Sequence, residues 1–275
     1  MLILLPPSEG KATPSTGSAL DLANLSMPEL NPARNRVAQA LVKLCEGRPA
    51  RAQRVLGLST LQDSELERDR RLLTAPAARA VEVYTGVVYD SLGYPTLPPA
   101  AQHRLDEWVV IASALWGAVR LTDHIPAYRC SADVTLPRVG PLGTFWRKPL
   151  ATAIPEAAGS SGVVFDLRSG GYAKMWSPSA ELTERTVVGR VLQRRPDGST
   201  KVVSHHNKAT KGRLVRALAK QRKAPESVSG LAEIVESLGF SANLVAPAAN
   251  KPAQLDIVVD ELASVQRSRT GGTSR

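Results

Sequence analysis

Short apolar runs bounded by proline, glycine or polar residues predict the strands of this chain. Residues 2–5 (Leu-Ile-Leu-Leu) are expected to form a buried first strand, and residues 108–115 are the strongest candidate for a central strand. The other expected strands are residues 163–167, a hairpin of residues 186–193 and 200–204, and residues 254–260. Two prolines close the first strand, so it would deliver the polar corner Ser-Glu-Gly-Lys to one edge of a sheet.

Apolar residues at helical spacing predict helices between these strands. One helix is expected to begin at Asn31-Pro32 and to end near Gly47, and the others span residues 62–73, 76–83, 207–223 and 229–238. Strands and helices alternate without a repeat or a clear linker. The pattern therefore predicts one α/β (mixed α+β) domain over residues 1–262, with a central mixed sheet flanked by helices. Residues 263–275 are expected to be a disordered basic tail.

The composition argues against several classes of protein. The first apolar run is too short for a signal peptide and has no basic residue before it. No window approaches the roughly 18 apolar residues of a membrane span. Cys45 and Cys130 are the only cysteines, and they lack the CxxC spacing of a zinc site. We therefore expect a cytoplasmic protein with no membrane contact, no metal site and no cofactor.

The charge of the chain is concentrated in one segment. Of 35 Lys and Arg and 25 Asp and Glu, residues 190–223 hold eleven basic residues and one acidic residue, which leaves 24 of each sign elsewhere. A concentrated basic segment favours an anion-binding surface, although a solvated face is the simpler alternative. In the helix of this segment, Leu214, Val215 and Leu218 share an apolar face, and basic residues occupy another arc. The candidate DNA contacts are Lys208, Lys211, Arg213, Arg216 and Lys220.

Polar side chains gather where the expected strands end. In open α/β sheets, ligands bind beyond the carboxyl ends of the strands. The candidate ligand-binding residues are Ser8, Tyr84, Thr85, Trp116, Gly117, Arg120, Tyr128, Arg129, Ser169, Tyr172 and Lys174. If the protein is an enzyme, the candidate catalytic residues are Glu9, Lys11 and Asp123, because carboxylates and amines can move protons.

Each of these candidates has a structural alternative. Arg120 and Asp123 can form a purely structural pair. Tyr84 can be a core residue at the end of a helix. Phe145-Trp146 could stack a base but is more often part of a core. The corner at residues 6–11 is not a phosphate-binding loop of the GxxxxGK[ST] type, since only Gly-Lys survives.

Several of these segments match a known family in order along the chain. They are Val83-Tyr84-Thr85-Gly86; Ser113, Leu115, Gly117, Arg120, Asp123, Tyr128 and Arg129 in the pattern S-x-L-[YW]-G-x-x-R-x-x-D-x-x-x-x-Y-R; Phe145-Trp146; Leu167, Ser169, Tyr172 and Lys174; and Ser204, Lys208, Lys211 and Gly212. With the opening strand and its corner, they resemble the YaaA family (DUF328, UPF0246) of peroxide stress proteins over about residues 1–240. The chain departs from many members at Glu9, where they carry lysine, and at Gly171, where an acidic residue is common.

The resemblance implies a fold and a function. It implies a single α/β domain of the type described as a cantaloupe fold. It implies a role in the response to hydrogen peroxide, linked to limiting iron-dependent damage. It also implies binding of duplex or junction DNA through a basic cleft, with a helix-hairpin-helix-like element. Residues 55–58 (Val-Leu-Gly-Leu) are the segment considered for that element.

Two functional hypotheses follow. In the first, the protein binds DNA through the basic segment and so helps to limit oxidative damage. In the second, it is an enzyme that acts on a nucleobase, a nucleotide or a related small anionic molecule. Its pocket would then be built from Glu9, Lys11, Arg120, Asp123, Arg129 and Tyr172. A third, simpler interpretation makes the basic segment a solvated face.

Overall fold

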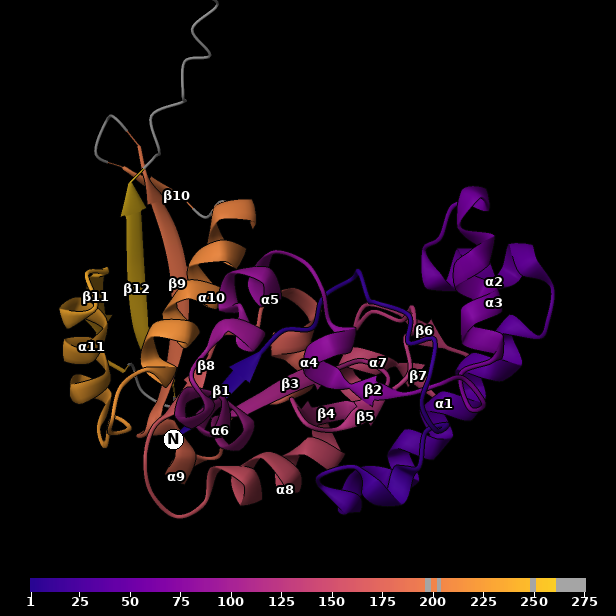
Figure 1. Cartoon of the computed structure of the whole chain (residues 1–275), viewed down its shortest axis with the longest axis horizontal. Coiled ribbons are helices and arrows are strands. Elements are labelled where there is room, and N and C mark those ends of the chain that lie inside the picture. The colour runs from indigo at the N-terminus through magenta and orange to yellow at the C-terminus, as the bar shows by residue number, and fades with distance from the viewer. Residues whose placement is uncertain (196–198, 202–203, 248–250, 261–275) are drawn as a thin grey trace, which may run out of the picture.

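A computed structural model of the chain describes residues 1–195, 199–201, 204–247 and 251–260. A central mixed sheet runs through it, with helices around it (Figure 1). In spatial order its strands are β11 (Ser241–Val245), β12 (Ala253–Asp260), β9 (Thr186–Arg194), β8 (Val164–Asp166), β1 (Leu2–Leu5), β3 (Val109–Ser113) and β4 (Gly117–Arg120), and β10 (Thr200–Lys201) also pairs with β9.

The middle of the sheet is parallel. Ile3 of β1 pairs with Val109 of β3 on one side and with Phe165 of β8 on the other. Beyond β8, strands β9 and β12 continue in the same direction, whereas β4 and β11 are antiparallel to their neighbours. All four residues of β1 are buried, as a strand covered on both faces requires. Because parallel strands end at one edge, the loops after β1, β3 and β8 are neighbours.

Helices fill the connections between the strands. The N-terminal helices are α1 (Asn31–Cys45), α2 (Pro49–Leu56), α3 (Asp63–Arg70), α4 (Ala80–Val83), α5 (Val87–Leu92) and α6 (Pro99–Trp108). The later ones are α7 (Leu142–Phe145), α8 (Arg147–Ala158), α9 (Ala180–Thr183), α10 (Ser204–Ala219) and α11 (Val228–Ser237). Helices α1, α2 and α3 lie at one end of the long axis of the molecule, and α11 lies at the other (Figure 1).

The remaining elements are short. The 3-10 helices are η1 (Leu22–Asn24), η2 (Pro28–Leu30), η3 (Thr60–Gln62), η4 (Tyr94–Thr96) and η5 (Gly170–Met175). Two small antiparallel pairs lie outside the main sheet: β2 (Ala78–Arg79) with β5 (His124–Ile125), and β6 (Thr135–Leu136) with β7 (Gly140–Pro141).

Two close contacts fix helices around the sheet. The buried Arg34 of α1 donates hydrogen bonds to the carbonyl oxygens of Trp116, 3.0 Å away, and Ala118, 2.7 Å away, and so ties α1 to β4. Helix α10 packs against α5 at Gly212, where a Cβ would lie 2.2 Å from the carbonyl oxygen of Val88. Only glycine permits this approach of the two helices.

The structure confirms the mixed α/β class, and it contains a strand within each segment that was predicted to form one. The helices differ more from expectation. Helix α4 is a single turn, and α10 ends at Ala219, so Lys220 follows the helix instead of belonging to it. The expected basic tail at 263–275 lies outside the described residues. Among the residues that are described, no helix combines the length and apolar character that crossing a membrane demands.

Gly117 gives a test of the packing. Its backbone has a φ of +74°, and a Cβ there would lie 2.6 Å from the ring of Trp146. Gly117→Ala should therefore lower the free energy of unfolding by more than about 2 kcal/mol, because overpacking adds to the left-handed backbone penalty. Gly57→Ala is the matched control, since Gly57 also has a left-handed φ of +66° but has no atom within 4 Å of a Cβ. Urea denaturation measures both; equal losses would contradict the packing at Gly117.

Candidate functional site

The loop after β1 forms a tight polar corner at the carboxyl edge of the sheet. The Ser8 hydroxyl donates to the carbonyl oxygen of Gly10 over 2.6 Å and accepts from the Thr85 N–H over 3.1 Å. A single β-bridge then joins Lys11 to Tyr84. These contacts join the corner to the segment after α4. Ser8 therefore lies beside Tyr84 and Thr85, two other residues of the predicted ligand site.

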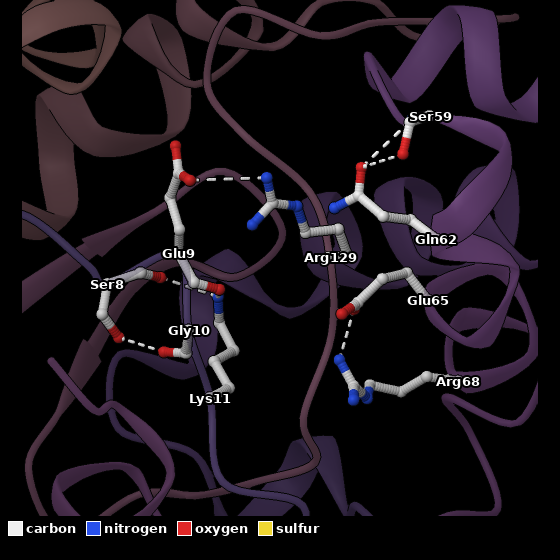
Figure 2. A network of polar contacts seen from close by, with 9 residues as sticks. All are labelled: Ser8, Glu9, Gly10, Lys11, Ser59, Gln62, Glu65, Arg68 and Arg129. Atoms are coloured by element: carbon white, nitrogen blue, oxygen red, sulfur yellow. Dashed lines mark hydrogen bonds and ion pairs between the residues drawn. The ribbon is translucent and has the colours of Figure 1, made fainter.

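The Lys11 amine is the central group of the corner (Figure 2). Its Nζ donates to the carbonyl oxygen of Ser8 over 2.8 Å and lies 4.2 Å from the centre of the Tyr128 ring. Burial and the nearby Arg129 guanidinium lower the pKa of Lys11 to about 8. The Tyr128 ring face opposes this shift, but a cation–π contact is worth only about 1 kcal/mol, less than one pKa unit. A pKa of about 8 leaves roughly one in ten of these amines neutral at pH 7.

Arg129 joins the corner to helix α3. Its guanidinium Nη2 lies 3.4 Å from the Glu9 carboxylate, a pair that is weakened by solvent because the Glu9 side chain is 80% exposed. Its backbone N–H donates to Asp69 Oδ1 over 2.9 Å. Figure 2 shows the side chains of Glu9 and Arg129 facing each other, with Gln62 and Glu65 of the α3 region on the other side.

Asp69 was missed in the sequence analysis. It is 0% exposed, and its Oδ2 has no hydrogen-bond partner among the described residues. Burial raises the pKa of Asp69 to about 7, and the charge of Lys11 opposes that rise. The sequence contained a signal for this position. Asp69 follows the apolar Leu66 by three residues, so on a helix both lie on one face, and that face of α3 is buried.

A chain of hydrogen-bonded hydroxyl groups holds the tyrosine rings on which the Lys11 amine packs. The Tyr84 and Tyr128 hydroxyls are 2.8 Å apart, and the Tyr128 hydroxyl is 2.7 Å from Ser113 Oγ. Ser113 Oγ in turn accepts from the N–H of Trp116 over 3.0 Å. Burial raises the pKa of Tyr84 to about 12, so these rings stay neutral beneath the amine. Tyr84 and Tyr128 therefore support the site, while their burial keeps them from lining an open pocket.

Arg120 and Asp123 do not belong to this corner. The segment expected as a strand-end loop is itself β4, which runs back along β3 so that Arg120 pairs with Val110. The Arg120 guanidinium donates to the carbonyl oxygen of Glu107. The Asp123 carboxylate accepts from the backbone N–H groups of Ser26 and Arg120 and from the Ser26 hydroxyl. Both residues hold the fold, as the structural alternative supposed.

Trp116 and Gly117 also serve the core. Trp116 is fully buried, and Gly117 makes room for the ring of Trp146, whose indole N–H donates to the carbonyl oxygen of Ala114 over 2.7 Å. The Trp146 ring, and not a ligand, occupies the space that Gly117 leaves open. Phe145 and Trp146 are likewise packed edge to face against each other.

The loop after β8 is held by buried charges. The Arg168 guanidinium forms two hydrogen bonds with the Asp166 carboxylate, at 2.9 and 2.7 Å. Lys211 of α10 reaches the end of the same strand and donates to the carbonyl oxygen of Leu167 over 2.7 Å. Of the predicted residues here, Ser169 and Lys174 are exposed, and Tyr172 is half-buried.

The basic residues of the α10 region do not form the continuous ridge that helical spacing suggested. Lys211 is only 7% exposed, and burial lowers its pKa to about 8. Arg216 is half-buried and donates to the carbonyl oxygens of Leu92 and Gly93, where it caps α5. Lys208, Arg213 and Lys220 remain exposed.

A second basic surface is a groove of about 940 Å³ between α1, the start of α2 and the turn at residues 137–139. None of the described residues that line it is acidic. Its basic residues are Arg36, Lys43, Arg48, Arg51 and Arg138. Charge counting along the sequence missed this groove, because its basic residues come from separate segments of the chain. Glu46 lies beside it and forms an exposed ion pair with Lys43 over 3.9 Å.

Helices α2 and α3 form a hairpin beside this groove. Gly57 ends α2 in a left-handed conformation, and the N–H of the next residue, Leu58, donates to the carbonyl oxygen of Gln53 over 2.8 Å. Ser59 and Gln62 then form a capping box that starts the turn into α3. Residues 55–58 are thus the last two residues of α2 and the first two residues of its connection to α3.

Comparison with known proteins places the chain in a family. Residues 1–244 match the family described as peroxide stress protein YaaA. The chain belongs to the YaaA family. It is 48% identical to a UPF0246 protein of Streptomyces coelicolor, over 95% of this chain and 100% of that protein. It is 40% identical to a UPF0246 protein of Corynebacterium efficiens, over 89% of this chain and 95% of that protein. An uncharacterized protein of Campylobacter jejuni is 25% identical over 81% of this chain and 86% of that protein.

In this YaaA-family protein, the matching motifs mostly support the corner. Ser113, Tyr84 and Tyr128 form the hydroxyl chain, Gly117 admits Trp146, and Gly212 brings α10 onto α5. The side chain of Ser204 lies outside the part of the chain that is described. Most of the motif residues therefore pack or form hydrogen bonds around Lys11 and Arg129, and few of them are placed to contact a ligand.

Neither cysteine is placed for redox chemistry. Burial raises the pKa of Cys45 to about 12 and that of Cys130 still further, so both stay as inert thiols. Across the described ranges, no cluster of three or more His, Cys, Asp or Glu side chains could hold a metal ion.

Asp69 gives a pH test of the site. Its folded pKa of about 7 lies above its ordinary value of 3.8, so its contribution to stability is complete below about pH 4 and is lost as the pH rises to 7. Asp69→Asn should therefore gain stability relative to wild type across this window, by at most about 1.4 kcal/mol per pH unit. The exposed Asp90→Asn is the control. Urea denaturation at pH 4, 5.5 and 7 measures both differences, and a flat difference for Asp69→Asn would refute the raised pKa.

Proposed function

We propose that this YaaA-family protein binds the sugar-phosphate backbone of duplex or junction DNA through the groove between α1 and α2. The basic groove is the observation that carries this proposal. Its five basic side chains surround one hollow, and the described residues lining it bring no carboxylate to repel phosphate. Such a surface binds DNA by displacing counterions and reads little of the sequence.

The turn at residues 137–139 is fixed against the groove's helical wall. The Arg36 guanidinium of α1 donates to the carbonyl oxygen of Arg138 over 2.8 Å and stacks 5.6 Å from the centre of the Phe145 ring. A wall held in this way loses little entropy when it binds a polyanion.

The α2–α3 hairpin supports the same proposal. Helix α2 begins with Arg48 and Arg51 in the groove and ends at the Gly57 turn. On this proposal, the α2–α3 hairpin, which follows the groove along the chain, would serve as the helix-hairpin-helix-like element that the family resemblance implies. In the family's peroxide response, bound DNA would be shielded from the iron-dependent radicals that attack its sugars.

The groove can be tested against the exposed part of the α10 region. Arg48→Glu with Arg51→Glu and Arg213→Glu with Lys220→Glu change the net charge equally, and all four side chains are exposed. The groove double variant should lose about 10-fold or more in affinity for DNA at about 100 mM salt, with a shallower salt dependence, because it no longer neutralises phosphates. The α10 double variant should retain most of its affinity.

Fluorescence anisotropy with a labelled duplex and a four-way junction, across a salt series, measures both variants. The reverse order of losses would move the DNA site to Lys208, Arg213 and Lys220. Wild-type binding that is absent, or insensitive to salt, would overturn DNA binding altogether.

The second hypothesis, an enzyme acting on a nucleobase or a small anionic ligand, is favoured by the corner. Arg129 and Lys11 place two cationic groups beside the exposed Glu9. Under this hypothesis a ligand from a panel of nucleobases and nucleotides should raise the melting temperature of wild type and of the exposed-lysine control Lys148→Ala. Arg129→Ala should lose that shift but still bind DNA. Equal shifts in wild type and Arg129→Ala would refute the pocket.

A further inference from the structure

We propose that the Lys11 amine is a nucleophile that forms an imine with an aldehyde carried by DNA, the ring-opened sugar of a nucleotide that has lost its base. This inference rests on the proposed binding of DNA and assigns a reaction to the polar corner after β1. The geometry of three groups carries it: the Lys11 amine, the Asp69 carboxyl group and the side chains of the α2–α3 hairpin.

The amine is held ready at the edge of the solvent. Its two hydrogen bonds go to the carbonyl oxygens of Ser8, at 2.8 Å, and Glu9, at 3.4 Å, so both acceptors belong to the corner itself. Glu9 and Gly10 are exposed, and Lys11 is half-buried. The amine thus contacts the tyrosine rings on one side and backbone of the exposed corner on the other.

The protonation state suits nucleophilic attack. With a pKa of about 8, roughly a quarter of the Lys11 amines are neutral at pH 7.5, against about one in a thousand for an ordinary lysine. Lys211 has a similarly lowered pKa, and its amine also donates to a carbonyl oxygen, but Lys211 is only 7% exposed whereas Lys11 is half-buried. Lys11 is therefore the accessible member of this pair.

Asp69 supplies a buried acid–base group whose charge acts on the amine. It acts electrostatically on Lys11, and its Oδ2 is buried without a hydrogen-bond partner among the described residues. A carboxyl group with a pKa of about 7 can both give and take a proton near neutral pH. Arg129, Glu65 and Cys130 are the other titratable groups that act on Lys11.

The reaction needs no oxidant and no co-reactant. The lone pair of neutral Nζ attacks the aldehyde carbon, a C–N bond forms, and the carbonyl electron pair moves to oxygen, which takes a proton. The carbinolamine then loses its hydroxyl group as water when the nitrogen lone pair forms the C=N bond. A proton passes from nitrogen to solvent or Asp69 and another reaches the departing hydroxyl, so that one water is released per imine.

The hairpin favours DNA as the carrier of the aldehyde. Leu61 lies in η3 directly before Gln62, which lies on the side of Arg129 away from the corner (Figure 2), and Leu61 is 93% exposed. Exposed apolar side chains of this kind enter gaps between base steps. A nucleotide without a base leaves such a gap, and radical attack on DNA sugars also produces aldehydes. Both agree with a family that acts in peroxide stress.

Borohydride trapping tests the imine, because hydride reduces C=N to a stable C–N bond. The full-length protein is mixed with a duplex that holds one abasic site and with sodium borohydride, and covalent complexes are counted on a denaturing gel. Wild type and Lys148→Ala should form a cross-link, and peptide mapping should place it on Lys11. Lys11→Arg and Lys11→Ala should lose the cross-link at least about 50-fold, while Lys11→Arg still binds intact duplex.

The outcomes separate this inference from the proposed function. If wild type binds intact duplex but no cross-link forms, or if Lys11→Arg is trapped as well as wild type, the nucleophile is refuted and DNA binding stands. If no duplex is bound, 2-deoxyribose 5-phosphate serves as the second probe. If borohydride attaches this sugar to Lys11 and to no other lysine, Lys11 is a nucleophile but DNA is not the carrier of its aldehyde. If the sugar is not attached to Lys11, Lys11 is not the proposed nucleophile.

Discussion

Placing a lysine amine against two neutral tyrosine rings at the carboxyl edge of the sheet is the constraint on which the rest of this structure depends. Strand β1 must be central and parallel to both neighbours for its end to meet the loops after β3 and β8. The hydroxyl groups of Tyr84 and Tyr128 must then be satisfied by each other and by Ser113, since buried polar groups without partners are costly. Burial at this edge and the Arg129 guanidinium then disfavour the charged form of Lys11, and the cation–π contact with Tyr128 offsets only part of that effect.

The two candidate surfaces share one segment of the chain. Helix α2 lines the basic groove, and α3 carries Asp69 to the Arg129 backbone beside Lys11. The hairpin between these helices therefore connects a surface suited to phosphate with a corner suited to proton transfer. This continuity explains why a DNA-binding hypothesis and an enzyme hypothesis both arise from the same sequence, and why they need not exclude each other.

The fold and part of the site could be predicted from local patterns. Apolar runs closed by proline or glycine identified β1, β3 and β8, and the rule that sites follow strand ends identified Ser8, Lys11 and Arg129. Arg120 and Asp123 were misjudged because Gly117 turns the chain into β4, which carries them back along β3. Lys211 and Arg216 were expected to be free for DNA, because helical spacing shows on which face of a helix a side chain lies but not what packs against that face. Helix α5 receives the hydrogen bonds of Arg216.

Measuring the pKa of the Lys11 amine tests the central claim most directly. Protein labelled with carbon-13 and nitrogen-15 at lysine is titrated from pH 6 to 12 by NMR, and Lys11→Arg assigns the Lys11 signal by its disappearance. The account predicts a midpoint near pH 8, about 2.5 pH units below the ordinary lysine value of 10.5. A midpoint near 10.5, the ordinary value for lysine, would contradict it, because the corner would then hold a simple ammonium ion.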